Sequence, residues 1–391
     1  MGDVAEFSKG SGYSKGDLVE YGTPIILYGR LYTNYETRIS DVDTFVEAKV
    51  GSVYSKGGEV IVPASGETAE DIARAATVDK SGILLGGDLN IVMPNKDINS
   101  SFLAISISSG NPQRELAKKA QGKSVVHIHN EEIKNLVLPF PIKDEQNKIA
   151  SYFCQLDNLI TLHQRKYDKL VMSKKSMLEK MFPKNGQTKP EIRFSGFIDD
   201  WEQRKLGELG SLKNGMNFSK KAMGIGFPFV NLQNIFGNNV IDVSNLGKAM
   251  ASDSQLKDYN LLNGDVLFVR SSVKLEGVGE AALVPQTLDN TTYSGFIIRF
   301  RDEYGLDNNF KRFVFGIESV RNQIMSQATN SANKNISQSV LENIELAIPS
   351  KSEQQKIGAY FSNLDHLITL HQRELEKLKK IKLSMLEKMF V

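Results

Sequence analysis

The sequence predicts an α+β protein: two similar mixed α/β domains separated by two long helices that form an antiparallel coiled coil, with an internal pseudo-twofold repeat. Three observations support this fold. The heptapeptide LITLHQR occurs at Leu159–Arg165 and again at Leu367–Arg373, 208 residues later. The match extends without a gap from Asp144–Phe182 to Ser352–Phe390, with 25 identities in 39 positions. The segments that precede the two copies follow one plan, and such a repeat defines the architecture before any local motif does.

The first and third segments, residues 1–143 and 185–351, share an order of short strands, glycine turns and a closing helical pattern. Residues 57–65 (GGEVIVPAS) resemble 263–272 (NGDVLFVRSS), and helical patterns begin at Phe102 and Phe310. Alternating strands followed by a helix predict a mixed α/β domain in each segment. One difference is that Pro190–Leu206, with the only tryptophan, has no counterpart before Gly2, so the first domain either lacks this segment or is shortened there.

The repeated segments, residues 144–184 and 352–391, are predicted to be long helices, because the aligned part lacks proline and contains one glycine. Asp144 and Ser352 are suitable N-caps. Residues recur at heptad spacing and predict a seam between the paired helices. The predicted seam comprises Ile149, Leu156, His163, Leu170, Met177, Ile357, Leu364, His371, Leu378 and Met385, with Leu159, Ile160, Leu367 and Ile368 beside them.

A simpler alternative is that each helix packs only on its own domain. Two matching stripes in one chain favour pairing instead, and a pseudo-twofold axis makes the pair antiparallel. His163 and His371 then meet near the helix midpoints. We interpret them as polar residues that fix the register rather than as metal ligands or catalysts.

Composition limits the function classes. The net charge is +2, so any nucleic-acid surface must come from local clustering of basic residues. A single cysteine, Cys154, excludes an internal disulfide and a cysteine-rich zinc site. With no signal-peptide pattern and no apolar run of about 20 residues, the sequence predicts a cytoplasmic protein without a membrane segment.

Catalytic motifs are missing from the sequence. Gly122–Ser124 reads GKS, but Ala117 stands where a phosphate-binding loop needs glycine. The five histidines show no metal-site spacing, and there is no nucleophile elbow. We therefore expect a binding protein, with an enzyme of unrecognised site as a remaining alternative.

Polar and basic residues cluster in the loops of both domains. Arginine, asparagine and glutamine can make bidentate contacts to base edges, and lysine contacts phosphates. Solvated loop residues are the simpler interpretation of any one of them. The DNA-binding candidates are Tyr13, Lys15, Arg30, Tyr32, Asn34, Tyr35, Arg38, Lys123, Lys213, Asn217, Lys220, Lys221, Asn231, Gln233, Asn234, Arg270, Lys274, Asn333 and Lys334.

The whole plan resembles the specificity subunit of type I restriction–modification systems. The matching residues in the first helix are Glu145, Gln146, Lys148, Ile149, Phe153, Leu156, Asp157 and Ile160. Their counterparts in the second are Glu353, Gln354, Lys356, Ile357, Phe361, Leu364, Asp365 and Ile368. The segments WEQRKLGEL and GDVLFVRSS also look like the opening and central strand of that family's target recognition domains.

The resemblance implies target recognition domains at 1–143 and 185–351 and spacer helices at 144–184 and 352–391. Each domain would read one half of a bipartite, asymmetric site in double-stranded DNA. The helices would space the domains and dock two methyltransferase subunits, which use S-adenosylmethionine and flip the target adenine. Two restriction subunits, using ATP and Mg, would complete the complex. The chain itself would bind no cofactor and no metal and perform no catalysis. A coiled-coil scaffold protein that does not read DNA sequence is the alternative.

Overall fold

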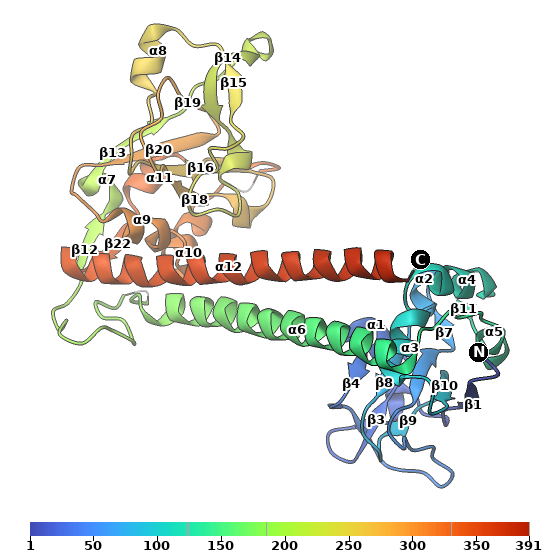
Figure 1. Cartoon of the computed structure of the whole chain (residues 1–391). Coiled ribbons are helices and arrows are strands. Elements are labelled where there is room, and N and C mark those ends of the chain that lie inside the picture. Colours follow the sequence, from blue (N-terminus) through green and yellow to red (C-terminus); the bar gives the residue numbers. More distant parts are fainter. Residues whose placement is uncertain (123–124, 185, 330, 391) are drawn as a thin grey trace. The chain divides into compact units, whose positions relative to one another are not determined.

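The structure, a computed structural model, describes residues 1–122, 125–184, 186–329 and 331–390. The chain divides into two compact units. Unit 1 comprises Met1–Lys166 with His371–Val391, and unit 2 comprises Tyr167–Leu370. Two long helices, α6 (Lys143–Lys180) and α12 (Lys351–Met389), each contribute one half to either unit (Figure 1).

Unit 1 contains two principal sheets. The strands of the five-stranded sheet follow in the order β1 (Ala5–Lys9), β10 (Leu89–Pro94), β6 (Val60–Pro63), β8 (Ala76–Val78) and β4 (Arg38–Ile39). The four-stranded sheet has the order β2 (Leu18–Val19), β5 (Phe45–Val46), β3 (Thr23–Ile26) and β9 (Leu84–Leu85). A separate strand pair joins β7 (Ser65–Gly66) to β11 (Val126–His127).

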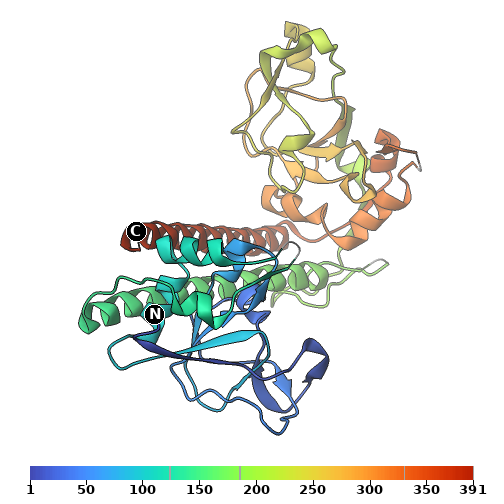
Figure 2. The same ribbon diagram turned by 90° about the vertical axis from the view of Figure 1, so that its right-hand side faces the viewer.

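Four helices of unit 1, among them α3 (Ser100–Ile107), pack on one face of the five-stranded sheet, whereas α1 (Arg30–Thr33) contributes Leu31 to the core on the other face (Figure 2). Alternate residues of β6 serve two cores, because successive side chains of a strand point to opposite faces. Val60 and Val62 pack under the helices, and Ile61 packs toward the second sheet. The helices are α1 (Arg30–Thr33), α2 (Ala69–Ile72), α3 (Ser100–Ile107), α4 (Gly110–Lys119) and α5 (Asn130–Lys134).

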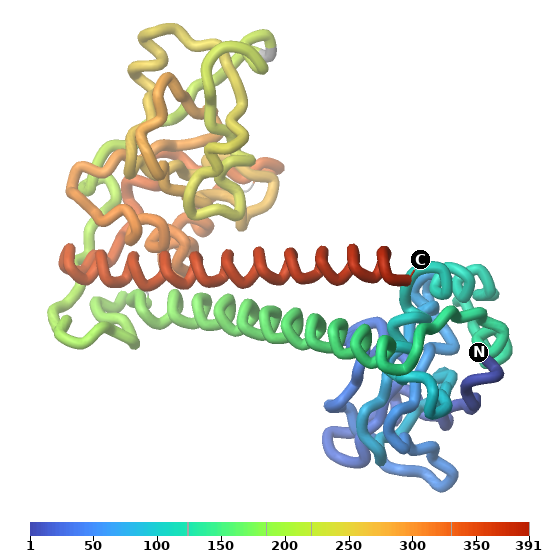
Figure 3. Tube along the Cα trace, viewed as in Figure 1, coloured from blue at the N-terminus to red at the C-terminus, as the bar shows by residue number. Residues whose placement is uncertain are grey.

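Unit 2 also combines a central sheet with helices, and Figure 3 traces the course of the chain. Its four-stranded sheet has the order β13 (Gly210–Asn214), β20 (Ile297–Asp302), β16 (Val266–Val269) and β18 (Ala281–Leu283). Smaller sheets are β15 (Gly247–Ala249), β14 (Met223–Val230) and β19 (Thr292–Tyr293); β12 (Glu202–Lys205) with β22 (Glu345–Ile348); and β17 (Ser271–Ser272) with β21 (Lys334–Asn335). Its helices are α7 (Leu206–Leu209), α8 (Asp253–Asp258), α9 (Asn308–Val314), α10 (Glu318–Ser326) and α11 (Gln338–Glu342).

The two domains are equivalent strand by strand. The order β13–β20–β16–β18 in unit 2 matches β1–β10–β6–β8 in unit 1. The starts of β10 and β20, of α3 and α9, and of α4 and α10 all differ by 208 residues, the offset of the repeated helices. The sequence therefore predicted correctly that two similar mixed α/β domains lie on a repeated framework.

In unit 1 the first half of α6 lies antiparallel to the second half of α12. The Lys382 Nζ donates to Asp157 Oδ1 at 2.5 Å, and the Nδ1 atoms of His163 and His371 lie 3.1 Å apart. Asp157 also accepts a hydrogen bond of 2.6 Å from the Thr37 hydroxyl, which ties α6 to the domain.

In unit 2 the other two halves make the matching contacts. The Lys174 Nζ donates to Asp365 Oδ1 at 2.5 Å, and the rings of Phe182 and Phe361 lie 6.1 Å apart. Each of these residues lies 208 positions from its counterpart in unit 1. The pairing within each unit is therefore antiparallel and in the same register, as the repeat predicts.

Burial on the two helices differs from the predicted seam at three positions. Leu156, Ile357 and Leu364 are buried, and Ile149, His163, Leu170, Met177, His371 and Leu378 are partly buried. Met385 is 37% exposed, because the adjacent Leu386 packs into the core in its place. Leu159 and Leu367 are also exposed, since both lie on the outer side of their helices.

A glutamine joins each long helix to its domain. The Gln146 Oε1 accepts a 2.9 Å hydrogen bond from the Asn99 backbone N–H, and Gln354 accepts the same bond from Asp307. Asn99 and Asp307 in turn cap α3 and α9. Both helices begin one residue before the predicted range, so Asp144 lies inside α6 and Ser352 inside α12 rather than at their caps.

The helix α12 also approaches its domain more closely than α6 does. Gly358 occupies the position of Ala150, and a Cβ atom there would lie 2.7 Å from the Asn309 Cβ and 2.7 Å from the Phe310 nitrogen. Glycine is required because no side chain fits in that space.

Candidate nucleic-acid interface

Unit 2 brings several predicted residues together around one groove. Strand β17 pairs with β21, with Ser271 opposite Asn335 and Ser272 opposite Lys334. This pairing places the segment after Arg270 beside Asn333. The groove has a volume of about 530 Å³. The groove of unit 2 is lined by Leu232, Phe236, Ser271, Ser272, Val273, Lys274, Glu276, Gly277, Glu280, Phe296 and Asn333.

A groove of about 540 Å³ in unit 1 is not its counterpart, because it is formed by different elements, namely residues 1–4, α3 and residues 134–140. In unit 2 the groove combines exposed apolar and polar side chains. Phe296 and Val273 present apolar surface, and Lys274 and Asn333 are exposed beside them. Such a mixture suits contacts to base edges, since carboxylates, amides and thymine-contacting apolar groups all contribute to readout.

Two further candidates, Arg270 and Asn217, lie at Gly295. The Arg270 guanidinium donates to the Gly295 carbonyl at 3.3 Å. A Cβ atom on Gly295 would lie 2.1 Å from the Asn217 Oδ1, so the glycine makes room for this amide. The structure therefore brings Arg270 and Asn217, which are 53 positions apart in the sequence, to one place.

The side chains of the turn at Asn231–Asn234 mainly make hydrogen bonds within the domain and are less available for contacts to DNA. Asn234 is buried, and its amide donates to the carbonyls of Asp242 and Asn245. Its prediction as a DNA contact is corrected, because the side chain is enclosed and its hydrogen bonds hold the loop together. Asn231 accepts a bond from the Leu232 N–H as a cap, and Gln233 remains exposed.

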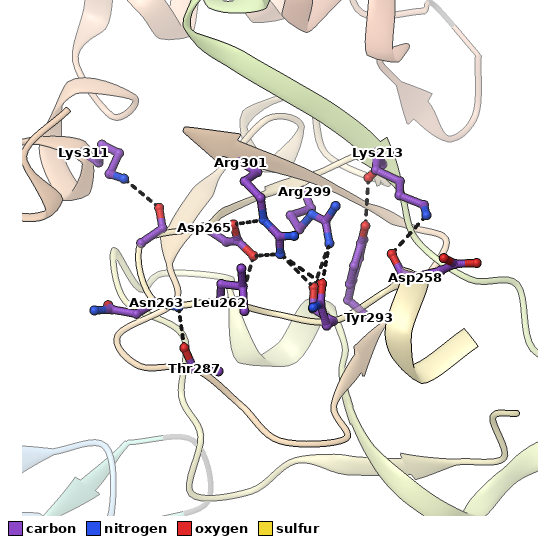
Figure 4. A network of polar contacts seen from close by, with 12 residues as sticks. Lys213, Asp258, Leu262, Asn263, Asp265, Thr287, Tyr293, Arg299, Arg301 and Lys311 are labelled. Carbon is purple, nitrogen blue, oxygen red and sulfur yellow. Dashed lines mark hydrogen bonds and ion pairs between the residues drawn. The ribbon is translucent and has the colours of Figure 1, made fainter. Parts of the chain in front are cut away.

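Lys213 belongs to a polar network of unit 2 that extends from the exposed Asp258 to the buried Asp265 (Figure 4). Its ammonium donates to the Asp258 carbonyl at 3.0 Å and lies 4.5 Å from the centre of the Tyr259 ring. The Tyr293 hydroxyl donates to the Lys213 carbonyl, and burial raises the pKa of this tyrosine. These contacts already engage Lys213, so it is less available to DNA than its sequence position suggests.

The centre of the same network is a buried carboxylate. Arg301 donates to both oxygens of Asp265, at 2.9 and 2.7 Å, and Leu262 donates its N–H at 2.8 Å. Nearby, burial lowers the pKa of Lys311, whose ammonium donates to the Gly264 carbonyl at 2.8 Å. Because its groups are paired within the domain, we interpret this network as a support for the 258–265 loop (Figure 4).

The equivalent place in unit 1 carries different chemistry. Strand β7 pairs with β11 where β17 pairs with β21 in unit 2. The Ser65 hydroxyl lies 3.2 Å from the His127 Nδ1, and the Tyr32 hydroxyl donates to the Ser65 carbonyl at 2.8 Å. One scaffold position thus presents Ser65 and His127 in one unit and Ser271 and Asn335 in the other.

Several candidates of unit 1 are held in internal contacts. The buried Tyr13 hydroxyl accepts from the Lys49 N–H and contacts Ser52, so its prediction as a DNA contact is corrected. Arg30 donates to the carboxylates of Glu36 and Asp43. These bonds keep the side chains within the domain.

Tyr35 and Arg38 are engaged in the same way. The Tyr35 hydroxyl donates to the Ala75 carbonyl, and Arg38 pairs with Asp79 although half of its side chain is exposed. Lys15, Asn34 and, in unit 2, Lys221 are exposed.

Two predictions, Lys123 and the side chain of Lys220, lie outside the described residues, and Lys334 is partly buried in β21. The candidates selected from the sequence did not include His127 and Asn335, which lie in the two strand pairs, or Phe296, which lines the groove of unit 2. The repeat offset was the available signal, because His127 and Asn335 are 208 residues apart.

The described residues show neither a cluster suited to a metal ion nor a helix suited to a membrane. They include no group of three or more histidine, cysteine, aspartate or glutamate side chains placed to hold a metal ion. Among the helices that the structure describes, none combines the length and apolar character needed to cross a bilayer.

Comparisons with known proteins agree with this architecture. The family model described as the type I restriction modification DNA specificity domain matches residues 1–172 and 198–380. The MjaVIII specificity subunit of Methanocaldococcus jannaschii is 23% identical over 372 residues, covering 91% of this chain and 83% of the relative. The EcoKI specificity subunit of Escherichia coli K12 is 23% identical over 70% of this chain and 60% of its own length.

Solved structures show the same fold. The S subunit of a type I restriction–modification system from M. genitalium aligns with a TM-score of 0.57 at 16% identity, covering 100% of this chain and 94% of that one. A structure described as showing complex assembly and conformational transition of the type I R-M system aligns with a TM-score of 0.53 at 15% identity, covering 100% and 96%. The family match spans both domains and most of both helices, and the chain therefore belongs to the type I restriction–modification DNA specificity family, as a specificity subunit rather than an enzyme.

Proposed function

We propose that the chain reads a bipartite, asymmetric site in double-stranded DNA, with one half-site assigned to each domain. The observation that carries this proposal is the strand pair that occurs in both units. The same scaffold presents Arg270, Lys274 and Asn335 around this pair in unit 2, and His127 beside Ser65 in unit 1. Equivalent scaffolds with different side chains would read different sequences.

The chemistry of the unit 2 groove supports base readout there. Lysine and arginine favour guanine, and asparagine favours adenine in the major groove. Glu276 and Glu280 at the groove are suited to accept a hydrogen bond from cytosine rather than to bind phosphate. Exposed lysines elsewhere, such as Lys15 and Lys221, supply the sequence-independent attraction to phosphates.

The long helices provide a spacer in this proposal. A helix of 38 residues, such as α6, extends about 57 Å at 1.5 Å per residue. The shared antiparallel register in each unit fixes how far each helix extends beyond its own domain. Helix length would then set the number of base pairs between the half-sites.

Exposed leucines of the repeated segment support a second role of the helices, as a docking surface for partner subunits. Leu159 and Leu162 are exposed in unit 1, and Leu367 and Leu370 are exposed in unit 2. Contiguous exposed apolar side chains commonly mark protein interfaces. In the proposed complex this surface binds two methyltransferase subunits, and two restriction subunits complete it. S-adenosylmethionine, ATP and Mg would belong to those partners and not to this chain.

Substitution of the unit 2 groove tests the DNA proposal. The complex is reconstituted with its methyltransferase subunits, and the methylated motif is determined by single-molecule sequencing. Exchanging Arg270 and Lys274 for the equivalent Ala64 and Thr68 of unit 1 should alter only one half of the motif. Lys189→Ala, which removes an exposed lysine that pairs with Asp200, is the matched control and should leave the motif unchanged.

The scaffold alternative predicts a different result. If the chain only assembles the complex, binding to a bipartite duplex and to its scrambled version will be equal at a stated salt concentration. Equal binding, or a change in both halves of the motif after the unit 2 exchange, would contradict the assignment of one half-site to each domain.

A further inference from the structure

Both domains contain a short exposed segment between a 3₁₀ turn and a strand of the smaller sheet. In unit 1 the 3₁₀ turn comprises Lys15–Asp17, and the strand β3 begins at Thr23. In unit 2 the 3₁₀ turn comprises Lys220–Ala222 and is followed directly by β14. We call residues 19–22 and 223–226, which are 204 positions apart, the tip segments of units 1 and 2.

Strand pairing shows that the two tip segments are structurally equivalent. In unit 1, Val46 of β5 pairs with Leu18, just before the tip segment, and with Thr23, just after it. In unit 2, Ala249 of β15 pairs with the first residue of the tip segment and with the residue that follows it. Beyond the tip segments, β3 pairs in parallel with β9, and β14 pairs in parallel with β19. Each tip segment therefore bulges out of the same place in the same small sheet.

The sequences of the tip segments agree at the positions that shape the bulge. An offset of 204 residues aligns YGTP at 21–24 with IGFP at 225–228. A Cβ atom would lie 2.6 Å (Gly22) or 2.7 Å (Gly226) from a carbonyl oxygen of the neighbouring strand. Glycine is required at both positions because the backbone of the bulge lies directly against that strand.

The residue before each of these glycines is apolar and exposed. Tyr21 is 81% exposed and Ile225 is 58% exposed. Two residues earlier, Val19 and Met223 are 38% and 41% exposed. A single exposed apolar side chain needs no explanation, but a pair repeated at equivalent positions of two domains indicates that each tip segment contacts a partner of the same kind.

The charge around the tip segment of unit 2 favours nucleic acid as this partner. Residues 209–241 contain three lysines and neither aspartate nor glutamate. Lys221 is exposed just before the tip segment, and Lys248 is exposed on the paired strand β15. In unit 1, Lys15 is exposed at the start of the 3₁₀ turn, and Glu20 is the one carboxylate in the tip segment. Exposed lysines beside apolar side chains suit a surface that attracts phosphates and inserts apolar groups between bases.

The tip segment of unit 2 is also connected to the groove of that unit. Asn217 lies against Gly295, next to Phe296 of the groove. Six residue steps lead from Asn217 to Met223, and such a segment spans at most about 20 Å. This distance corresponds to about six base pairs, so one duplex can contact both the groove and the tip segment. Strands β14 and β15 lie at the end of unit 2 remote from α12 (Figure 1).

We propose that Ile225 and its counterpart Tyr21 are wedges that insert between neighbouring base pairs, one in each half-site. An apolar side chain inserted at a base step unstacks it and kinks duplex DNA by about 20–90°. The cost of this deformation depends on the step and is low for pyrimidine–purine steps such as TA and CA. Each half-site then contains one step that is selected by its deformability rather than by hydrogen bonds. The wedges require that both domains bind duplex DNA and so rest on the proposed function.

DNA bending tests the wedge of unit 2. The chain is reconstituted with its methyltransferase subunits, and the bend of a duplex that carries the methylated motif is measured by energy transfer between dyes at its two ends. Ile225→Ser should reduce the bend and weaken binding by about tenfold, because an apolar side chain is no longer buried in the complex. Ile225→Leu should retain both. Ile198→Ser, at a position of unit 2 that is 79% exposed, is the matched control and should leave the bend unchanged.

A mismatch scan locates the inserted step and separates the two wedges. A single mismatch lowers the cost of unstacking, so at one step of a half-site it should tighten binding by the unmodified chain but not by the Ile225→Ser variant. Tyr21→Ser should abolish the corresponding effect in the other half-site only. Tyr21→Phe should preserve the effect, since the aromatic ring remains.

The outcomes distinguish the wedges from DNA reading itself. Equal bends with the unmodified chain and with Ile225→Ser would overturn the wedge, and DNA reading would stand if the complex still prefers its motif to a scrambled duplex. Equal binding of the unmodified complex to both duplexes would overturn the proposed function and the wedges together. Release of a methyltransferase subunit by Ile225→Ser, without a change in the bend, would identify the tip segment as a protein contact and would also overturn the wedge.

Discussion

Replacing Phe153 or its repeat counterpart Phe361 by alanine should destabilise one unit at a time. Both side chains are fully buried; Phe153 packs 6.2 Å from the Phe390 ring in unit 1, and Phe361 packs on Phe182 in unit 2. A buried ring removes about 150–250 Å² from water, which at about 25 cal/mol per Å² gives roughly 4–6 kcal/mol. Measured losses for such substitutions are about 3–5 kcal/mol.

The chain contains its own probe for each unit. The only tryptophan, Trp201, lies in unit 2, and the only cysteine, Cys154, lies in unit 1. Urea unfolding is followed by tryptophan fluorescence and by thiol labelling, normalised to the rate in full denaturant. With a urea m-value of about 2.5 kcal/mol/M, a loss of about 4 kcal/mol lowers the midpoint by roughly 1.5 M.

Phe153→Ala should lower the thiol-labelling midpoint and leave the fluorescence midpoint in place, and Phe361→Ala should do the reverse. Leu159→Ala, at a position that is 45% exposed on the same helix, is the control and should shift neither midpoint by more than a few tenths of a molar. If both probes move together in either variant, the two units unfold as one cooperative body and the reasoning is refuted.

Three other predictions follow from the helices. Burial raises the pKa of Cys154, so its thiol should react with a disulfide reagent more slowly than glutathione does at pH 7.5, and the rate should increase as the pH rises. Equal reaction rates of the folded chain and of glutathione would contradict this. Asp365→Ala should lower the free energy of unfolding of unit 2 by about 3 kcal/mol, and Asp157→Ala should lower that of unit 1 by about 2 kcal/mol. The first loss is larger because it leaves two cations, Lys174 and Arg312, without their carboxylate. Equal shifts of the fluorescence midpoint in the first variant and of the thiol-labelling midpoint in the second would count against this. Seven residues inserted into both long helices should add about 10.5 Å, or roughly three base pairs, to the spacer of the methylated motif. An unchanged spacer in methylome sequencing would disprove that helix length sets the distance between the half-sites.

Sequence periodicity and the repeat predicted the framework well. The offset of 208 residues located both helices, their antiparallel register and the matching strands, because backbone periodicity and repeated apolar positions determine these features. The outward direction of Leu159 and Leu367 was missed, since a heptad stripe does not reveal which of two adjacent apolar rows faces the partner.

The candidate site was predictable only in part. Arg30 and Arg38 looked like free basic residues, but their partners Glu36, Asp43 and Asp79 engage them inside the domain. The sequence does not reveal such pairings, because a loop residue finds its partner only after distant segments fold together. Conversely, the closeness of Arg270 to Asn217 depends on the sheet and had no local signal.

The close approach at Gly358 has a consequence for how the gene can evolve. Two similar stretches in one gene, identical here at 25 of 39 residue positions, invite conversion, in which one copy overwrites the other. Copying the first stretch over the second would put alanine at position 358, where the added methyl would meet Asn309 and Phe310 at 2.7 Å. Overwriting in the other direction would put glycine in place of Ala150 and leave a small void beside α3. The two copies should therefore keep this one difference even while exchange homogenises the residues around it.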